Sequence, residues 1–252
     1  MLVEACVDAV DAALEAQRGG AARIELCGEL LQGGVTPSAG LIGAVWERAE
    51  VPVFVLIRPR PGDFLYDDDE LDVMLRDIET ARSLDVDGIV LGALTPDGDI
   101  DIGTVHTLVE AAGAMEVTFH RAFDFVRDQD VALEALIELG VDRVLTSGGA
   151  ATALEGAPVL ARLVQQARGE ITILAGGSIT ASNVAEVVRV SRVREVHVRA
   201  ARRVDSGMTH RRGAVSLARP QLSDDYERMV TCADEMSLVL EALSGRHRTP
   251  SS

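Results

Sequence analysis

The sequence contains no lysine, and all 24 of its basic residues are arginine. Schiff-base catalysis requires a lysine amine, and a P-loop requires its lysine, so both are excluded. Arginine can hold a carboxylate or a phosphate through two parallel hydrogen bonds. An anionic small-molecule ligand therefore remains compatible with the composition.

Aromatic residues and positive charge are both scarce. Only 3% of the residues are aromatic, and the formal net charge is −16. Such a chain offers few stacking platforms for bases and repels phosphate backbones and anionic lipid surfaces. We therefore expect no nucleic-acid partner and no membrane partner.

Long apolar segments are missing as well, and cysteines are few. No segment approaches the roughly 20 apolar residues of a membrane helix, and Met1 to Val10 lacks the basic start of a signal peptide. Three cysteines, an odd number, fit free thiols better than a disulfide framework. These features predict a cytoplasmic protein.

Eight short apolar segments alternate with eight amphipathic ones. The expected strands are Val3–Cys6, Arg23–Cys27, Val53–Arg58, Gly88–Gly92, Val117–Arg121, Arg143–Gly148, Ile171–Gly176 and Glu195–Arg199. The expected helices are Asp8–Arg18, Ser38–Ala49, Asp68–Leu84, Asp101–Ala112, Asp128–Leu139, Ala157–Ala167, Ser182–Val190 and Ser223–Leu243. This pattern predicts an α/β fold with a single (β/α)₈ TIM barrel over residues 1–243. The polar residues 244–252 are expected to form a disordered tail.

The alternation of side chains along the strands sorts residues by direction. The face that carries Ile24, Leu26 and Ile89 is apolar, as a surface under helices should be. The other face must then point into the barrel, where charges are costly unless they are paired or bound. The inward residues include Glu4, Cys6, Glu25, Cys27, Arg58, His120, Ser147, His197 and Arg199.

Glu4 and Cys6 in the first strand face Glu25 and Cys27 in the second. Neighbouring strands lie roughly 4.8 Å apart, so the two thiols could share a soft ion such as Cu(I). Buried cysteine also serves as a small apolar residue. The two glutamates are candidates for a catalytic acid–base pair or for counterions of arginines.

Cationic residues cluster at or just past the strand ends. Arg58, Arg60, Arg121 and Arg199 could hold a carboxylate or phosphate. His120 is a candidate for catalytic proton transfer, with Glu4 and Glu25, and His197 for proton transfer or anion binding. Either histidine could also be a structural core residue.

Two glycine-rich turns follow the sixth and seventh strands. Their residues Ser147, Gly148 and Gly149, and Gly176 and Gly177, are candidates for binding an anion through backbone amides. The alternative is a tight turn that requires positive φ. The long loop from Pro59 to Tyr66 could cover the mouth of the barrel.

Five segments resemble the CutC family, which is named for copper homeostasis. They are RIELCGELLQGGVTPS from Arg23, IRPRPGDFLY from Ile57, LTPDGDID from Leu94, VTFHRAFD from Val117 and LTSGGA from Leu145. The resemblance runs from about Leu2 to Arg212 and implies a cytoplasmic TIM barrel that forms a homodimer. It also implies a role in copper homeostasis, with Cu(I) on Cys6 and Cys27.

Two hypotheses follow. In one, the protein binds copper through the cysteines at the barrel mouth. In the other, it is a metal-independent enzyme or binding protein for a small phosphorylated or carboxylated metabolite. The sequence does not decide whether the protein is an enzyme.

Overall fold

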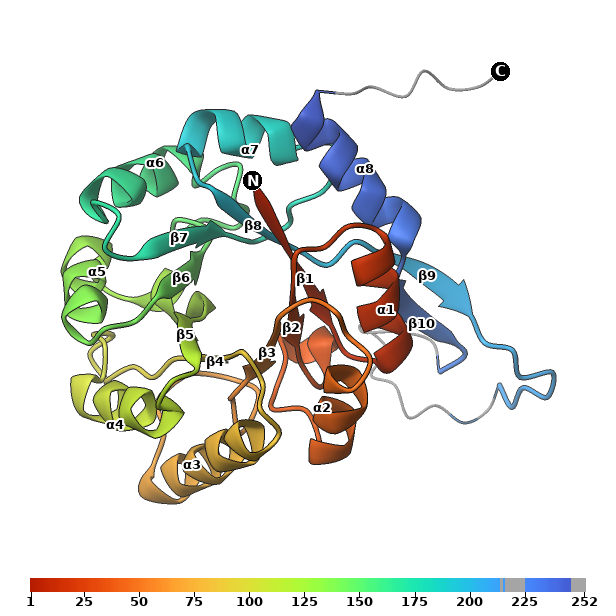
Figure 1. The fold of residues 1–252 in the computed structure, drawn as a ribbon, viewed down its shortest axis with the longest axis horizontal. Helices are drawn as coiled ribbons and strands as arrows, with labels where there is room; N and C mark the ends of the chain where they lie inside the picture. The colour runs from red at the N-terminus through yellow and green to blue at the C-terminus, as the bar shows by residue number, and fades with distance from the viewer. Residues whose placement is uncertain (214, 216–224, 246–252) are drawn as a thin grey trace.

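Eight parallel strands close into a barrel in the computed structural model, which describes residues 1–213, 215 and 225–245 (Figure 1). Each strand pairs with its neighbours in the chain, and β8 pairs with β1 to complete the ring. The strands are β1 Leu2–Val7, β2 Arg23–Leu26, β3 Val53–Leu56, β4 Gly88–Leu91, β5 Glu116–Phe119, β6 Arg143–Thr146, β7 Thr172–Ala175 and β8 Glu195–Val198. The predicted TIM barrel is confirmed.

Eight α-helices alternate with the strands in the described part of the chain and form the outer ring in Figure 1. They are α1 Val10–Arg18, α2 Ala39–Trp46, α3 Asp68–Ser83, α4 Ile102–Ala112, α5 Gln129–Glu138, α6 Ala157–Gln166, α7 Val184–Ser191 and α8 Ala233–Ser244. Two short 3₁₀ helices, η1 Leu30–Gln32 and η2 Arg121–Phe125, follow β2 and β5.

The apolar core lies between the strands and the helices. Ile24, Leu26 and Ile89 point outward from the barrel and are fully buried under the helices. Capping residues fix several helix starts; Asp67, for example, accepts from the amide of Glu70, whose side chain accepts from the amide of Asp67. The helices thus bury the apolar strand face, and the polar face is left for the barrel interior.

The last predicted helix begins in the wrong place. Residues 223–232 were expected to be helical, but β10 Glu227–Thr231 pairs antiparallel with β9 Ala201–Asp205 outside the barrel. Within the described residues 225–245, the helix covers Ala233–Ser244, and Gly245 caps it in a left-handed conformation. The rest of the predicted tail, residues 246–252, lies outside the described residues. No helix in the described ranges is long and apolar enough to cross a membrane.

Candidate functional site

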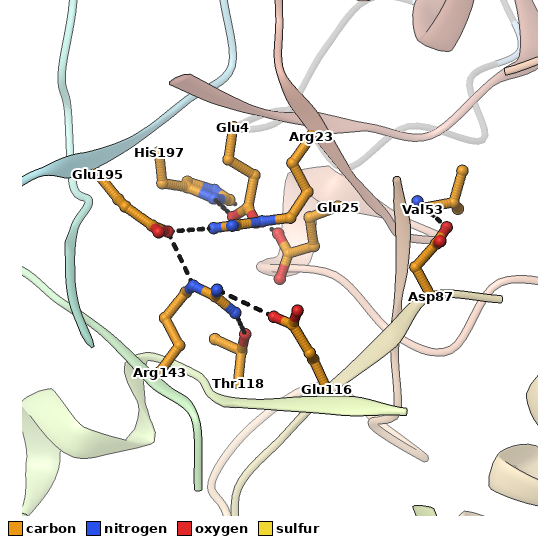
Figure 2. Close-up of polar contacts among 10 residues, drawn as sticks. All are labelled: Glu4, Arg23, Glu25, Val53, Asp87, Glu116, Thr118, Arg143, Glu195 and His197. Atoms are coloured by element: carbon orange, nitrogen blue, oxygen red, sulfur yellow. Dashed lines mark hydrogen bonds and ion pairs between the residues drawn. The ribbon is translucent and has the colours of Figure 1, made fainter. Parts of the chain in front are cut away.

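Ion pairs fill the end of the barrel where the strands begin (Figure 2). The Glu195 carboxylate accepts from Arg23 Nη2 at 2.6 Å and from Arg143 Nε at 2.8 Å. Arg143 also pairs with Glu116 at 3.1 Å. These groups compensate one another's charge, as burial requires. These ion-paired side chains therefore fill this end of the barrel.

Glu4 joins this network to the next layer of side chains. Its carboxylate accepts from Arg23 Nε at 2.5 Å and contacts His197 Nδ1 at 2.7 Å. Burial raises the pKa of Glu4, but the hydrogen bond from His197 and the charge of Arg23 outweigh it and lower the pKa to about 2. Glu4 is therefore an ionised counterion.

His197 lies between two carboxyl groups. Its Nε2 is 3.6 Å from Glu25, on the side opposite to Glu4. Burial lowers the pKa of His197, but Glu25, Cys6 and Glu4 together raise it well above its usual value. Both ring nitrogens are thus engaged by acidic side chains of the protein itself.

The thiols of Cys6 and Cys27 lie 3.9 Å apart, close enough for one to donate to the other. Both are buried, with exposed fractions of 8% and 1%. The hydrogen bond from Cys27 lowers the pKa of Cys6 to about 5 and raises that of Cys27 well above its usual value. The pair therefore holds one thiolate and one thiol at neutral pH.

Glu25 completes the cluster. One carboxylate oxygen of Glu25 and the two sulfurs all lie within 4.8 Å of one another. Burial first, and then the charge of Cys6, raise the pKa of Glu25 well above its usual value. The pKa of Glu25 is thus shifted in the opposite direction to that of Glu4.

A cavity of about 860 Å³ opens in front of the thiols. Its volume leaves room for a small organic molecule. Residues from several strand ends line it: Cys6, Glu25, Cys27, Arg58, Phe64, His120, Arg121, Gly177, Ser178, Ile179, His197 and Arg199 are among them. The structure thus brings most of the predicted site residues around one space.

Arg58 and His120 lie on the side of this cavity formed by β3 and β5. The Arg58 guanidinium donates to the carbonyls of Gly34 and Gly62, each at 2.7 Å, so it fixes loops. His120 accepts from the amide of Ala122 through Nδ1, which places its proton on Nε2, where it has no partner among the described residues. Burial, with the charge of Arg58, lowers the pKa of His120 to about 3.

One of the four predicted anion-binding arginines, Arg60, lies apart from the others. Arg60 pairs with Glu70 and with Asp63, and it does not line the cavity. Arg199 lines the cavity and also a second pocket, of about 350 Å³, beside Asp8 and β10. Arg60 therefore holds the loop after β3 rather than a ligand.

The glycine turn after β6 already binds an anion, which is the side chain of Asp124. The carboxylate of Asp124 accepts from the amides of Ser147 at 2.9 Å and Gly149 at 3.0 Å and from the Thr146 hydroxyl at 2.5 Å. The amide of Gly148 donates to the hydroxyl of Thr146 at 2.8 Å. Nothing in this turn remains to hold a ligand.

Asp124 is the central acceptor of this turn, and the sequence interpretation missed it. It stands in the segment VTFHRAFD, four residues after His120. Its acceptor role could not be predicted, because the amides it binds come from a strand end 23 to 25 residues away.

A model of the CutC family matches residues 1–202. The chain belongs to the CutC family. It is 47% identical over 230 residues to the copper homeostasis protein CutC homologues of Mus musculus and Homo sapiens. These alignments cover 91% of this chain and 85% and 84% of the two proteins. They extend past Arg212, where the resemblance was expected to end.

Solved structures agree with this assignment. The CutC protein of Streptococcus agalactiae has a TM-score of 0.76 and 33% identity, and the alignment covers 79% of this chain and 98% of that protein. Phosphoribosylanthranilate isomerase of Thermotoga maritima has a TM-score of 0.56 at 13% identity, with coverage of 97% and 99%. At that identity the second likeness shows the barrel fold alone.

Proposed function

We propose that this protein takes part in copper homeostasis by binding Cu(I) between the sulfurs of Cys6 and Cys27. The observation that carries the proposal is the pair of free thiols 3.9 Å apart at the floor of an open cavity. Thiolates are soft ligands, which Cu(I) favours over carboxylate or carbonyl oxygens. The family of the chain and the names of its relatives support the role in copper homeostasis.

The protonation state favours capture of a monovalent soft ion. Cys6 is ionised near neutral pH, so only the proton of Cys27 has to leave when both sulfurs bind. The resulting pair of thiolates with one Cu(I) carries a net negative charge, and the protonated His197 beside Cys6 compensates it. Binding of Cu(I) therefore requires the loss of one proton, and the charge that remains is balanced by His197.

The other side chains of the cluster argue against a divalent ion. Structural Zn²⁺ takes four ligands, usually cysteine and histidine. Here the other candidates are His197, which contacts Glu4 at 2.7 Å, and Glu25, and the pKa of each is raised well above its usual value, which favours the protonated form. The two sulfurs are the soft ligands of this cluster, which suits a soft ion of low coordination number.

The test is an anaerobic titration of Cu(I) into the protein against a competing chelator. We expect one tight site in the wild-type chain, and loss of that site in Cys6→Ser and in Cys27→Ser. Cys232 is also a buried free cysteine, but it lies at the start of α8 away from the cavity. Cys232→Ser is therefore the matched control, and it should bind Cu(I) like the wild type.

Two results would overturn the proposal. One is a wild-type protein that competes with the chelator for Cu(I) no better than Cys6→Ser or Cys27→Ser does. The other is a preference of the same site for Zn²⁺ over Cu(I) in a parallel titration.

We propose further that the protein works in the cytoplasm as a homodimer. Its three cysteines are all free, which is the state that a reducing compartment maintains. Sedimentation of the purified protein tests the dimer, and fractionation of cells tests the location.

A further inference from the structure

Two neighbouring strands of the barrel end in similar glycine turns, but only one of them has its amides occupied. After β6, the amides of Ser147 and Gly149 donate to the carboxylate of Asp124. Turn amides that converge on one oxyanion in this way form an anion-binding nest. The turn after β6 thus shows that a glycine turn at this end of the barrel can bind a carboxylate.

The turn after β7 has the same chemistry and no internal anion. The amides of Gly177, Ser178 and Ile179 have no acceptor among the described residues. Gly177 and Ser178 have φ of +111° and +55°, and the carbonyl of Gly177 accepts from the amide of Ala153, which fixes the turn. All three residues line the large cavity.

A cationic side chain lies directly beside this turn. A Cβ atom placed on Gly177 would be 3.5 Å from Cζ of Arg121. Arg121 uses Nε for Asp124 and Nη2 for the hydroxyl of Ser147, at 2.7 Å and 3.0 Å. Its Nη1 has no partner in the described part of the chain, and its side chain is 41% exposed. One guanidinium edge is therefore free next to the unpaired amides.

The charge of the cavity contrasts with that of the whole molecule. The chain carries −16, yet the arginines of the lining, Arg58, Arg121 and Arg199, outnumber its acids, Glu25 and Asp63. Concentrated positive charge in a cleft draws anions even to an acidic protein. The space in front of the turn is also large enough for an organic group attached to the anion.

We propose that the turn formed by residues 176–179, with Arg121, binds the phosphate group of a small organic phosphate that occupies the cavity. A phosphate offers three terminal oxygens, and the turn and the arginine offer several N–H donors to them. The site is distinct from the thiol pair and does not require copper. It is therefore independent of the function proposed above.

The test uses inorganic phosphate and copper-free protein labelled with nitrogen-15, at neutral pH. We expect saturable shifts of the amide signals of Gly177, Ser178 and Ile179, with a dissociation constant on the order of 1 mM. The amide of Gly149, which already donates to Asp124, should barely move. Acetate, titrated in parallel, should bind more weakly because it has two oxygens.

Ser178 provides a matched pair of variants. Its left-handed conformation is one that aspartate and asparagine tolerate well, so Ser178→Asp and Ser178→Asn should both fold. Ser178→Asp places a negative charge in the turn and should weaken phosphate binding by about tenfold or more. Asparagine has the size of aspartate without its charge, so Ser178→Asn should bind phosphate nearly as tightly as the wild type does.

Three outcomes would overturn the proposal: no saturation with phosphate, acetate binding tighter than phosphate, or equal binding by the two variants. Cys6→Ser serves to separate this site from the copper site. It should keep phosphate binding while losing Cu(I), so failure of either proposal is visible without the other.

Discussion

Nδ1 of His197 in the last strand of the barrel lies 2.7 Å from the carboxylate of Glu4 in the first. The contact crosses the seam at which the barrel closes, where Glu4 and His197 stand opposite each other in the register of β1 and β8. It holds a cation beside Cys6, the residue whose pKa is lowered to about 5. The contact that joins β8 to β1 therefore also favours the thiolate form of Cys6.

Replacing this histidine should make the Cys6 thiol harder to ionise. In His197→Gln the amide can still donate to Glu4, but the positive charge is lost. A cation favours the thiolate, so its removal should raise the pKa of Cys6 from about 5 toward 9.0. The measurement is the pH dependence of alkylation of the Cys6 peptide, followed by mass spectrometry.

His106→Gln is the control for this change. His106 is 58% exposed on α4, and the same substitution there should leave the pH dependence of Cys6 alkylation unchanged. An unchanged profile in His197→Gln as well would show that the hydrogen bond from Cys27 alone sets the ionisation of Cys6.

The sequence predicted the strands better than the last helix. The apolar runs VFVL and GIVL are followed within two residues by Arg58 and Gly92, so the core strands were placed within one or two residues. The segment ERMVT of β10 mixes polar and apolar residues, and its strand exists because it pairs with β9. Pairing with a distant segment leaves no local signal.

The same limit applies to the site. Alternation along each strand predicted which residues point inward, and the thiols, the two glutamates and both histidines line or adjoin one space. The alternation does not predict which neighbouring side chain neutralises which charge. The opposite pKa shifts of Glu4 and Glu25 follow from the hydrogen bond with His197 and the charge of Arg23, which together lower the pKa of Glu4.

The ion-pair layer at the closed end of the barrel should be important for stability. Glu195→Gln leaves Arg23 paired with Glu4, but Arg143 then keeps the half-exposed Glu116 as its charged partner and the Thr118 hydroxyl as a neutral one. Loss of one partner from a buried charge network typically costs about 3 kcal/mol. We expect the free energy of unfolding in urea to fall by about that amount.

Glu186→Gln is the matched control for this prediction. Glu186 pairs with Arg189 on the exposed face of α7, where solvent screens the charges. Its unfolding curve should coincide with that of the wild type. If both variants lost the same stability, the effect would not come from burial of the network.

His120 should make the protein less stable as the pH falls. Its pKa in the folded chain is about 3, below the ordinary 6.5, because of burial and of the charge of Arg58. Between these values the unfolded chain binds the proton and the folded chain does not, so the free energy of unfolding decreases as the pH drops from about 6.5 toward 3. His120→Asn keeps an acceptor for the amide of Ala122 and removes the titration. Urea unfolding of both proteins over this range should therefore give a pH slope that is shallower in the variant, by up to about 1.4 kcal/mol per pH unit. Parallel slopes would mean that His120 is protonated in the folded protein and that its Nε2 reaches solvent.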